Sequence, residues 1–371
     1  MRKWWVFHCF LILLGGYGFI TANEMQGAEK GKAGRVLSLE EVMRIEDGGG
    51  DYYFKSPRKI RIAPDGCIFM LDDEQFLKFS PDGRFIKNLF KKGQGPGEFE
   101  GINSYVITED ALVVLQPQPN KFVILTHDGG LIREFRTEGR IAKLFAVHNG
   151  RYVTGRYSSP KIDRVTEKPS FMQVEWNLGL VSEEGGVDEP NPRFSTRWYA
   201  KRLGGRAVIA DHLANFSAVP YGDDHLIICH TEHYRLKLFD LAHNRVVREF
   251  GRKYHRVKSL RDKFGQIEVR PGVSKLVSPV EYVNDVQQIF SLGEYIWVMT
   301  STIERGKGVL FDVFNFKGEY VDHFYLPIHD TVKPEGLEDL PLVFSGNHLF
   351  IAEYDEDGIP AVVKYRIMDN G

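Results

Sequence analysis

Cysteine and net charge are both scarce in this sequence. Only three cysteines occur in 371 residues, which excludes the dense disulfide framework of small secreted domains. The formal charge is −2 at pH 7, with 26% charged residues, and this balance excludes the strongly basic face of a nucleic-acid-binding protein. A chain of this length can bury a large apolar core, so we expect packing to stabilise the fold.

Long helical patterns are also rare. The segment GQGPG at residues 93–97 has the glycines of a phosphate-binding loop. The residues that follow continue with strand and turn signals, however, and not with the helix that such a loop requires. The segment is therefore predicted to turn the chain between strands. The sequence predicts one short helix, over residues 259–269 with Ser259 as its N-cap.

The longest apolar run lies at the N-terminus. Two basic residues precede an almost uninterrupted apolar stretch over residues 4–20, and Ala22 is a small residue suited to cleavage. This pattern predicts a secretory signal peptide over residues 1–22. An uncleaved anchor is the alternative, since the run is almost long enough to span a bilayer, but Gly15 and Gly16 favour cleavage. We therefore expect an exported protein, periplasmic or extracellular.

Removal of the signal peptide would leave two cysteines, Cys67 and Cys229. Each lies in an apolar run, and both are predicted to be buried free thiols.

The rest of the sequence repeats with a period of about 45 residues. A strand, a tight turn with Asp, Asn or Gly, and a second strand form a hairpin signature, which recurs at residues 76–90, 122–135, 235–250 and 313–324. A second series of hairpins begins at Lys59, Ser104, Lys143, Asn215, Val286 and Pro341. Six four-stranded units of this length predict an all-β, six-bladed β-propeller.

The last unit lacks its fourth strand after residues 361–368, and the missing strand is expected at the other end of the chain. Residues 48–54 repeat the glycine and phenylalanine pattern of residues 93–99, so residues 35–46 precede the first unit as an outer strand. We predict one propeller domain over residues 35–369, whose last blade this strand closes so that no sheet edge stays unpaired. Phe99 is expected to fill the gap between two blades.

The segment GQGPGEF at residues 93–99, the hairpin after it and FSPDG at residues 79–83 resemble the NHL-repeat and related six-bladed propellers of bacterial envelopes. The resemblance covers nearly all of the mature chain and is best in the first blade. It implies the fold but not the activity, because such propellers serve as sensors, scaffolds, lyases and lactonases alike.

In such a propeller the inner strands begin at one mouth of the central channel. Equivalent positions there are predicted for Lys59, Asn103, Lys143, Asn215 and Asp285, with Asp339 nearby. The resemblance to lactonases implies a calcium ion held by Asn, Asp and Glu oxygens, but two lysines would repel it. We therefore expect no metal and no cofactor, with Ca²⁺ as the alternative. The ring favours a small polar or anionic ligand, or internal ion pairs such as Lys59 with Asp339.

The loops between second and third strands are expected to frame the same mouth. They are rich in acidic residues: Asp72, Asp73, Glu74, Glu232, Glu353, Asp355, Glu356 and Asp357. His230 and His233 lie among them, but residues three apart in a loop do not converge as they do on the helix of a zinc site. We expect a solvated rim, and no nucleophile with its base is recognisable.

These observations predict a binding or interaction module at the cell envelope. The alternative is a lactonase-like hydrolase or lyase with its active site at the channel mouth, and a third possibility is a scaffold for a neighbouring transporter or sensor. The expected partner is a protein or a small polar or anionic ligand, and not nucleic acid. Membrane contact is expected only through an uncleaved N-terminal segment, and the protein is expected to be a monomer.

Overall fold

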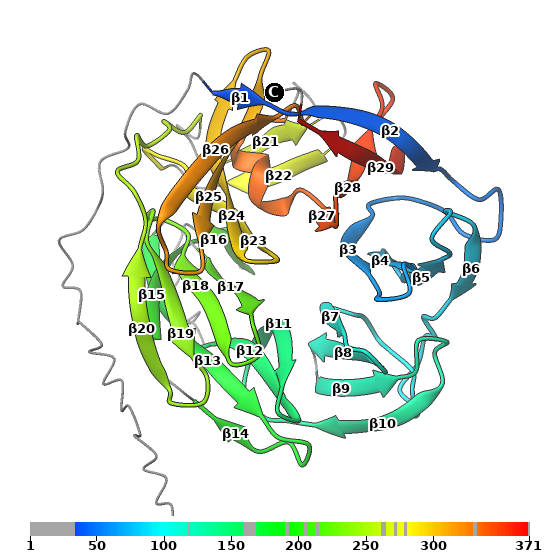
Figure 1. Ribbon diagram of the computed structural model, residues 1–371. Helices are drawn as coiled ribbons and strands as arrows, with labels where there is room; N and C mark the ends of the chain where they lie inside the picture. Colours follow the sequence, from blue (N-terminus) through cyan, green and yellow to red (C-terminus); the bar gives the residue numbers. More distant parts are fainter. Residues whose placement is uncertain are drawn as a thin grey trace, which may run out of the picture.

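The computed structural model describes residues 34–117, 119–158, 168, 170–189, 193–203, 206–212, 215–260, 265–270, 273–277, 280–328 and 332–369. Six antiparallel sheets stand around a common centre as the blades of a propeller (Figure 1). The predicted all-β, six-bladed fold is confirmed.

Blades I, II and IV have four strands each. Blade I contains β3 (Arg58–Ile62), β4 (Ile68–Asp72), β5 (Gln75–Phe79) and β6 (Phe85–Asn88). Blade II contains β7 (Ser104–Ile107), β8 (Leu112–Pro117), β9 (Asn120–Leu125) and β10 (Leu131–Arg136). Blade IV contains β17 (Phe216–Tyr221), β18 (His225–His230), β19 (Leu236–Asp240) and β20 (Arg245–Phe250).

Blades III, V and VI are more elaborate. Blade III contains β11 (Ile141–His148), β12 (Arg151–Tyr157), β13 (Ser170–Val181), the short β14 (Val187–Asp188), β15 (Arg193–Leu203) and β16 (Arg206–His212). Blade V contains β23 (Val286–Leu292), β24 (Tyr295–Glu304), β25 (Gly308–Asn315) and β26 (Tyr320–Leu326), with β1 (Arg35–Val36) at its edge. Blade VI contains β27 (Leu342–Ser345), β28 (His348–Tyr354), β29 (Pro360–Met368) and β2 (Ser38–Ile45).

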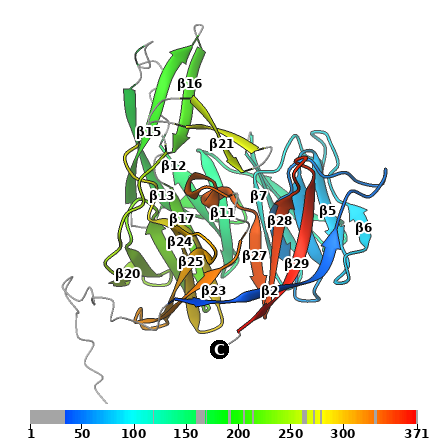
Figure 2. The same ribbon diagram turned by 90° about the horizontal axis from the view of Figure 1, so that it is seen from above.

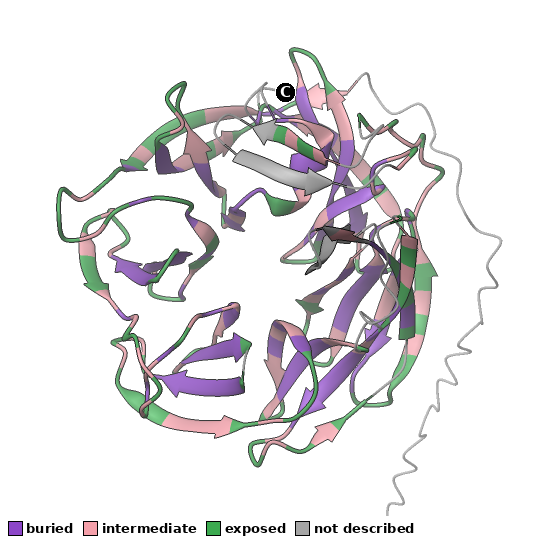
Figure 3. Ribbon diagram, turned by 180° about the vertical axis from the view of Figure 1, so that it is seen from behind, coloured by how far each residue is buried: buried purple, intermediate pink, exposed green. Residues whose placement is uncertain are grey.

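The middle strands of the blades form the core. Every residue of β4 and β5 is buried, whereas β6 at the outside alternates between intermediate and exposed positions. Figure 3 shows the same trend in other blades, with buried residues inside and exposed ones on the outer strands. Middle strands read as continuous apolar runs because neighbouring blades cover both of their faces.

The N-terminal strand closes the ring as predicted. β2 pairs antiparallel with β29, from Ser38 opposite Met368 to Ile45 opposite Val362. The two residues of β1 differ from the prediction, since they pair in parallel with β26 of blade V (Figure 1). Arg35 of β1 forms ion pairs with both Asp322 and Asp369, so one side chain joins blade V to the end of the chain.

The glycine-rich segment turns the chain between blades I and II, as predicted. Phe99 donates its backbone N–H to the carbonyl of Lys91 at 2.7 Å, and Gly93 donates to the carbonyl of Phe99 at 3.1 Å. Gly93 and Gly97 have φ values of 153° and 71°, and the positive φ of Gly97 is one that other residues rarely adopt. The Phe99 side chain is fully buried between blades I and II, which confirms its predicted role.

The long connections gather on one face of the ring, at which the inner strands β3, β7, β11, β17, β23 and β27 begin. We call this end the mouth face. The β15–β16 hairpin, the hairpin of β21 (Gly265–Arg270) and β22 (Val273–Val277), and the 3₁₀ helix η2 (Pro334–Asp339) each lie just before one of these strands. Figure 2 shows β15, β16 and β21 extending beyond the ring there.

The predicted helix over residues 259–269 is wrong where the structure describes that segment. Residues 265–269 belong to β21, which pairs with β22, and residues 261–264 lie outside the described residues. The alternation of QIEV suits a strand, and pairing with β22 outweighs the capping signal of Ser259. The segment instead carries Ser259 toward η2, where its hydroxyl donates to Glu335 at 3.0 Å.

The predicted signal peptide, residues 1–22, lies outside the described residues. Within the described part of the chain, the structure contains no helix with the length and apolar character needed to cross a membrane.

Both thiols of the ring are buried and free, as predicted. Cys67 lies in blade I and Cys229 in blade IV, on opposite sides of the ring (Figure 1), and burial raises the pKa of Cys229 to about 12. In a chain without residues 1–22, we expect thiol titration to find two free thiols in denaturant without reductant and slow reaction in the native protein. An intramolecular disulfide would contradict the arrangement of the blades.

Candidate functional site

Two lysines from different blades occupy the centre of the mouth face. Lys59 lies on β3 of blade I and Lys143 on β11 of blade III. Both lie where the pairing of the inner strand shifts register, between Arg58 and Arg61 in β3 and between Ile141 and Lys143 in β11. A bulge of this kind redirects a side chain relative to a regular strand.

The backbone of Lys59 is held in an uncommon conformation. Its φ is 55°, in the left-handed region that a residue with a Cβ rarely occupies. The hydroxyl of Tyr105, a buried residue of blade II, donates to the Lys59 carbonyl at 2.7 Å. Blade II therefore fixes the conformation that places Lys59 at the mouth, and strain of this sort is frequent at functional sites.

The two lysines share an enclosed and positively charged environment. Lys59 is accessible to solvent at the mouth, yet protein surrounds it, and this desolvation lowers its pKa to about 8, helped by the charges of Lys143 and Arg61 and opposed by Asp339. Desolvation also lowers the pKa of Lys143, against the nearby carboxylates of Glu338 and Asp339. Neither ammonium forms a hydrogen bond or ion pair with a described residue. The predicted ion pair of Lys59 with Asp339 is therefore not formed.

Three asparagines stand just before inner strands and join the elements around the mouth. Asn103 of blade II donates its amide to the carbonyl of Ala142 at the start of blade III. Asn215 of blade IV and Asn284 at the start of blade V donate to the same oxygen, Oε2 of Glu338, at 3.5 and 3.4 Å. Glu338 on η2 is thus a meeting point of two blades.

Asp285, the fifth residue predicted at the mouth, is engaged within the protein. It is 5% exposed, pairs with Arg256 at 3.0 Å and accepts the backbone N–H of Tyr234 at 3.2 Å. Burial raises the pKa of Asp285, and the hydrogen bond from Arg256 opposes this. The structure therefore brings together four of the five predicted residues, while Asp285 braces the connection between blades IV and V.

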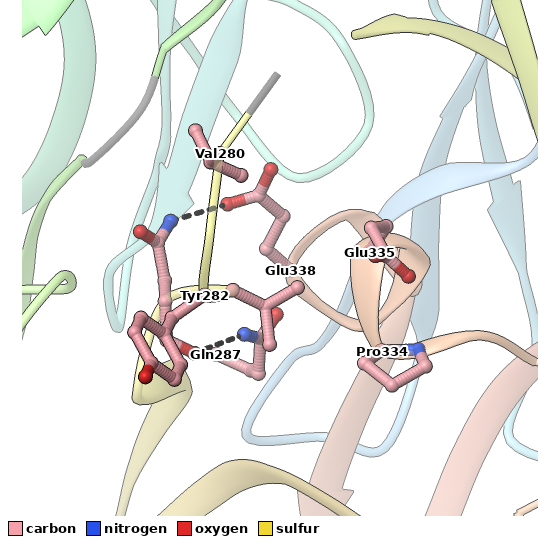
Figure 4. A pocket seen from close by; sticks show the side chains of 8 residues that line it. Val280, Tyr282, Gln287, Pro334, Glu335 and Glu338 are labelled. Carbon is pink, nitrogen blue, oxygen red and sulfur yellow. Dashed lines mark hydrogen bonds between the residues drawn. The ribbon is translucent and has the colours of Figure 1, made fainter. Parts of the chain in front are cut away.

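The helix η2 covers part of the mouth, and sequence reasoning missed its role. Gln288 at the register shift of β23 donates to the carbonyls of Leu337 and Leu340 at 2.9 and 2.8 Å. Glu335 accepts from the backbone N–H of Leu260 at 2.7 Å. Beside η2 lies a small pocket between the helix and residues 280–287 (Figure 4). The only sequence signal for Glu338 was its position next to Asp339.

The acidic rim is largely occupied by local partners. Asp72 is fully buried and accepts the backbone N–H groups of Lys55 and Ser56, both at 2.8 Å, so its placement on a solvated rim was wrong. Three further carboxylates pair with nearby cations: Asp73 with Lys55, Glu74 with Lys92 and Glu232 with Arg197. Part of the negative charge of the rim is therefore balanced by neighbouring lysine and arginine side chains.

The histidines of the rim stack on one another. The rings of His230 and His233 are 6.0 Å apart, and His230 Nε2 lies 3.0 Å from the carbonyl of Ser195. Desolvation lowers the pKa of His230. Among the described residues, no group of three or more His, Cys, Asp or Glu side chains is placed to hold a metal ion.

Comparison with known proteins supports the fold. Residues 48–181, which form blades I and II and continue through β13 of blade III, match the profile of a family described as a 6-bladed beta-propeller. No curated protein matches the sequence. A supposed exported protein from Bacteroides fragilis aligns with a TM-score of 0.55 at 10% identity, covering 92% of this chain and 98% of its own.

Two further solved structures align less well. A protein of unknown function from Bacteroides caccae has a TM-score of 0.44 at 12% identity, covering 81% of this chain and 97% of its own. A streptogramin B lyase has a TM-score of 0.43 at 10% identity, with coverages of 90% and 98%. Identities this low concern the fold alone.

Proposed function

We propose that the protein is an exported, NHL-like binding propeller that holds a small anionic ligand between Lys59 and Lys143. The observation that supports this most is that two blades place ammonium groups near each other at the mouth, where no described residue pairs with either of them. Two like charges that protein partly surrounds are less favourable than the same charges in water. A carboxylate, phosphate or sugar acid between the two lysines would offset that loss.

Export is supported by the N-terminal sequence, which has the charged start, apolar run and small residue of a signal peptide. The structure from Bacteroides fragilis, described as a supposed exported protein, is similar in fold alone. We propose that the binding propeller works in the periplasm or outside the cell.

The binding test uses a panel of anions on matched variants. We expect at least one of inorganic phosphate, D-glucuronate, D-galacturonate and succinate to bind by isothermal titration calorimetry, and Lys59→Met/Lys143→Met to weaken it at least ten-fold, because each lost charge-assisted contact is worth roughly 1.5–3 kcal/mol. Lys55→Met is the control, since Lys55 is exposed and already pairs with Asp73. An affinity unchanged in the double variant would refute this site, and turnover of the bound anion would favour a lyase or hydrolase.

The pH dependence of that binding has a predicted sign. The pKa of Lys59 is lowered to about 8, so the side chain is charged at pH 7 and mostly neutral at pH 9. For an anion of constant charge such as D-glucuronate, we expect affinity to fall about ten-fold between these pH values, whereas a lysine with an ordinary pKa would stay charged. The loss should be smaller in Lys59→Met, in which only Lys143, whose pKa is also lowered, can still titrate. A flat profile in the wild type would show either that Lys59 does not contact the ligand or that its pKa is ordinary.

A further inference from the structure

A second charged feature lies beside the lysines, in the pocket between η2 and residues 280–287. Its free volume is about 10 Å³, close to the smallest space that holds one water molecule. Four polar residues line it, namely Glu335, Glu338, Asn284 and Gln287, and Figure 4 shows Glu335, Glu338 and Gln287 around the space. Glu335 and Glu338 are three residues apart on a 3₁₀ helix, where such side chains lie one above the other. Both acidic residues therefore line a space of single-water size.

One carboxylate oxygen in this wall has no donor. Glu335 is only 2% exposed, and its Oε1 accepts from the hydroxyl of Ser259 and the backbone N–H of Leu260. Its Oε2 is also buried and has no hydrogen-bond partner among the described residues. A buried charged acceptor without a donor is unfavourable and rare. The pocket thus lacks a donor group at Glu335.

The pocket and the lysines are neighbours through Glu338. This residue lines the pocket, accepts the amides of Asn215 and Asn284, and acts electrostatically on Lys143. Carboxylates on η2 and ammonium groups on blades I and III therefore share the mouth.

We infer that the ligand at the mouth is a small zwitterion, whose ammonium group enters the pocket at Glu335 and whose acidic group lies at Lys59 and Lys143. An ammonium group is about the size of a water molecule, carries three donors and supplies the missing hydrogen bond to Glu335 Oε2. A divalent metal ion fits less well, because Ca²⁺ requires six to eight oxygen ligands and Lys143 would repel it. This inference rests on the proposed binding of an anion and adds the second half of the ligand.

A series of ω-amino acids tests the inference, because their length varies the distance between the two charges. The probes are glycine, 3-aminopropanoate, 4-aminobutanoate and 6-aminohexanoate, each compared with its alkanoate and its alkylamine. We expect at least one amino acid to bind the wild type ten-fold or more tightly than its matched alkanoate. Glu335→Gln should remove that gain and leave alkanoate binding unchanged. Glu356→Gln, an exposed rim residue, should retain the gain.

The outcomes separate the two proposals. Binding of alkanoates that depends on the lysines, with no gain from the amino group or with a gain that survives Glu335→Gln, overturns the zwitterion and leaves the anion site intact. Absence of any carboxylate binding overturns the zwitterion, and absence of phosphate binding as well overturns both proposals. Stabilisation by Ca²⁺ alone that disappears in Glu335→Gln would make the pocket a metal site and also overturn the zwitterion. If Glu335→Gln fails to fold, Glu338→Gln removes the second carboxylate of the wall and should lower the affinity of the amino acid relative to its matched alkanoate, although it also acts on Lys143; an unchanged ratio would overturn the zwitterion.

Discussion

A chain that begins at Asp51 is expected to aggregate or to unfold at a temperature at least 10 °C lower than a chain that begins at Gly34. The truncation removes β1 and β2, and with them the partner of β29. Leu37 and Ile45 are buried, at 5% and 3% exposure, and Leu39 and Met43 pack against the core. At about 1.5–3 kcal/mol for each fully buried side chain, the loss approaches the total stability of a typical domain, and the bared edge of β29 invites pairing between molecules.

The measurement is thermal unfolding together with size-exclusion chromatography. A chain that begins at Ser38 separates the contributions, because it keeps β2 and loses β1, the ion pairs of Arg35 and the buried side chain of Leu37. We expect this chain to stay monomeric and to lose less stability, since Arg35 and its partners are partly exposed and such pairs contribute little. A monomeric chain from Asp51 with an unchanged melting temperature would contradict closure by the N-terminal strand.

Replacement of Arg252 by methionine is expected to destabilise the protein by about 3–5 kcal/mol, because it leaves a buried carboxylate without its cation. Asp312 on β25 is fully buried and accepts from Arg252 at 2.7 Å and from the hydroxyls of Tyr234 and Tyr320 at 2.5 and 3.3 Å. The Arg252 guanidinium lies 5.3 Å from the ring centre of Tyr234 and 5.2 Å from that of Tyr254. The cluster joins blades IV and V, so its loss loosens one interface of the ring.

Denaturant unfolding of three variants measures this effect. Arg84→Met is the control, since Arg84 also pairs with an aspartate, at 2.8 Å, but is 81% exposed, and we expect a change below about 1 kcal/mol. Adding Asp312→Asn to Arg252→Met should recover part of the lost stability, because the buried charge disappears with its partner. Equal losses of unfolding free energy in Arg252→Met and Arg84→Met would show that the buried ion pair contributes no more to stability than the exposed one.

The number of blades and the closure of the ring follow from the amino-acid sequence. Each hairpin can be predicted from a stretch of about 15 residues, because its apolar side chains alternate and its turn requires Asp, Asn or Gly. Six such units and one strand left over at the N-terminus admit few arrangements without a free edge. The packing of Phe99 between two blades was also predictable, because a phenylalanine after a glycine-rich turn recurs with the period of the repeat.

Which polar residues remain available at the mouth depends on contacts between blades, and these form only in the folded ring. Asp285 precedes the inner strand of blade V as predicted, but its carboxylate accepts a hydrogen bond from Arg256, 29 residues earlier in the chain. It is therefore not available to a ligand. The bulge of Lys59 depends on Tyr105 in the next blade, and the pocket at Glu335 forms because Gln288 of blade V binds the carbonyls of η2. The strand at residues 265–269 likewise requires β22. A hairpin is specified by residues that are close together in the sequence, so a local pattern can predict it. Burial, ion pairing and charge at the mouth depend on residues of different blades, and a local pattern contains no information on these contacts.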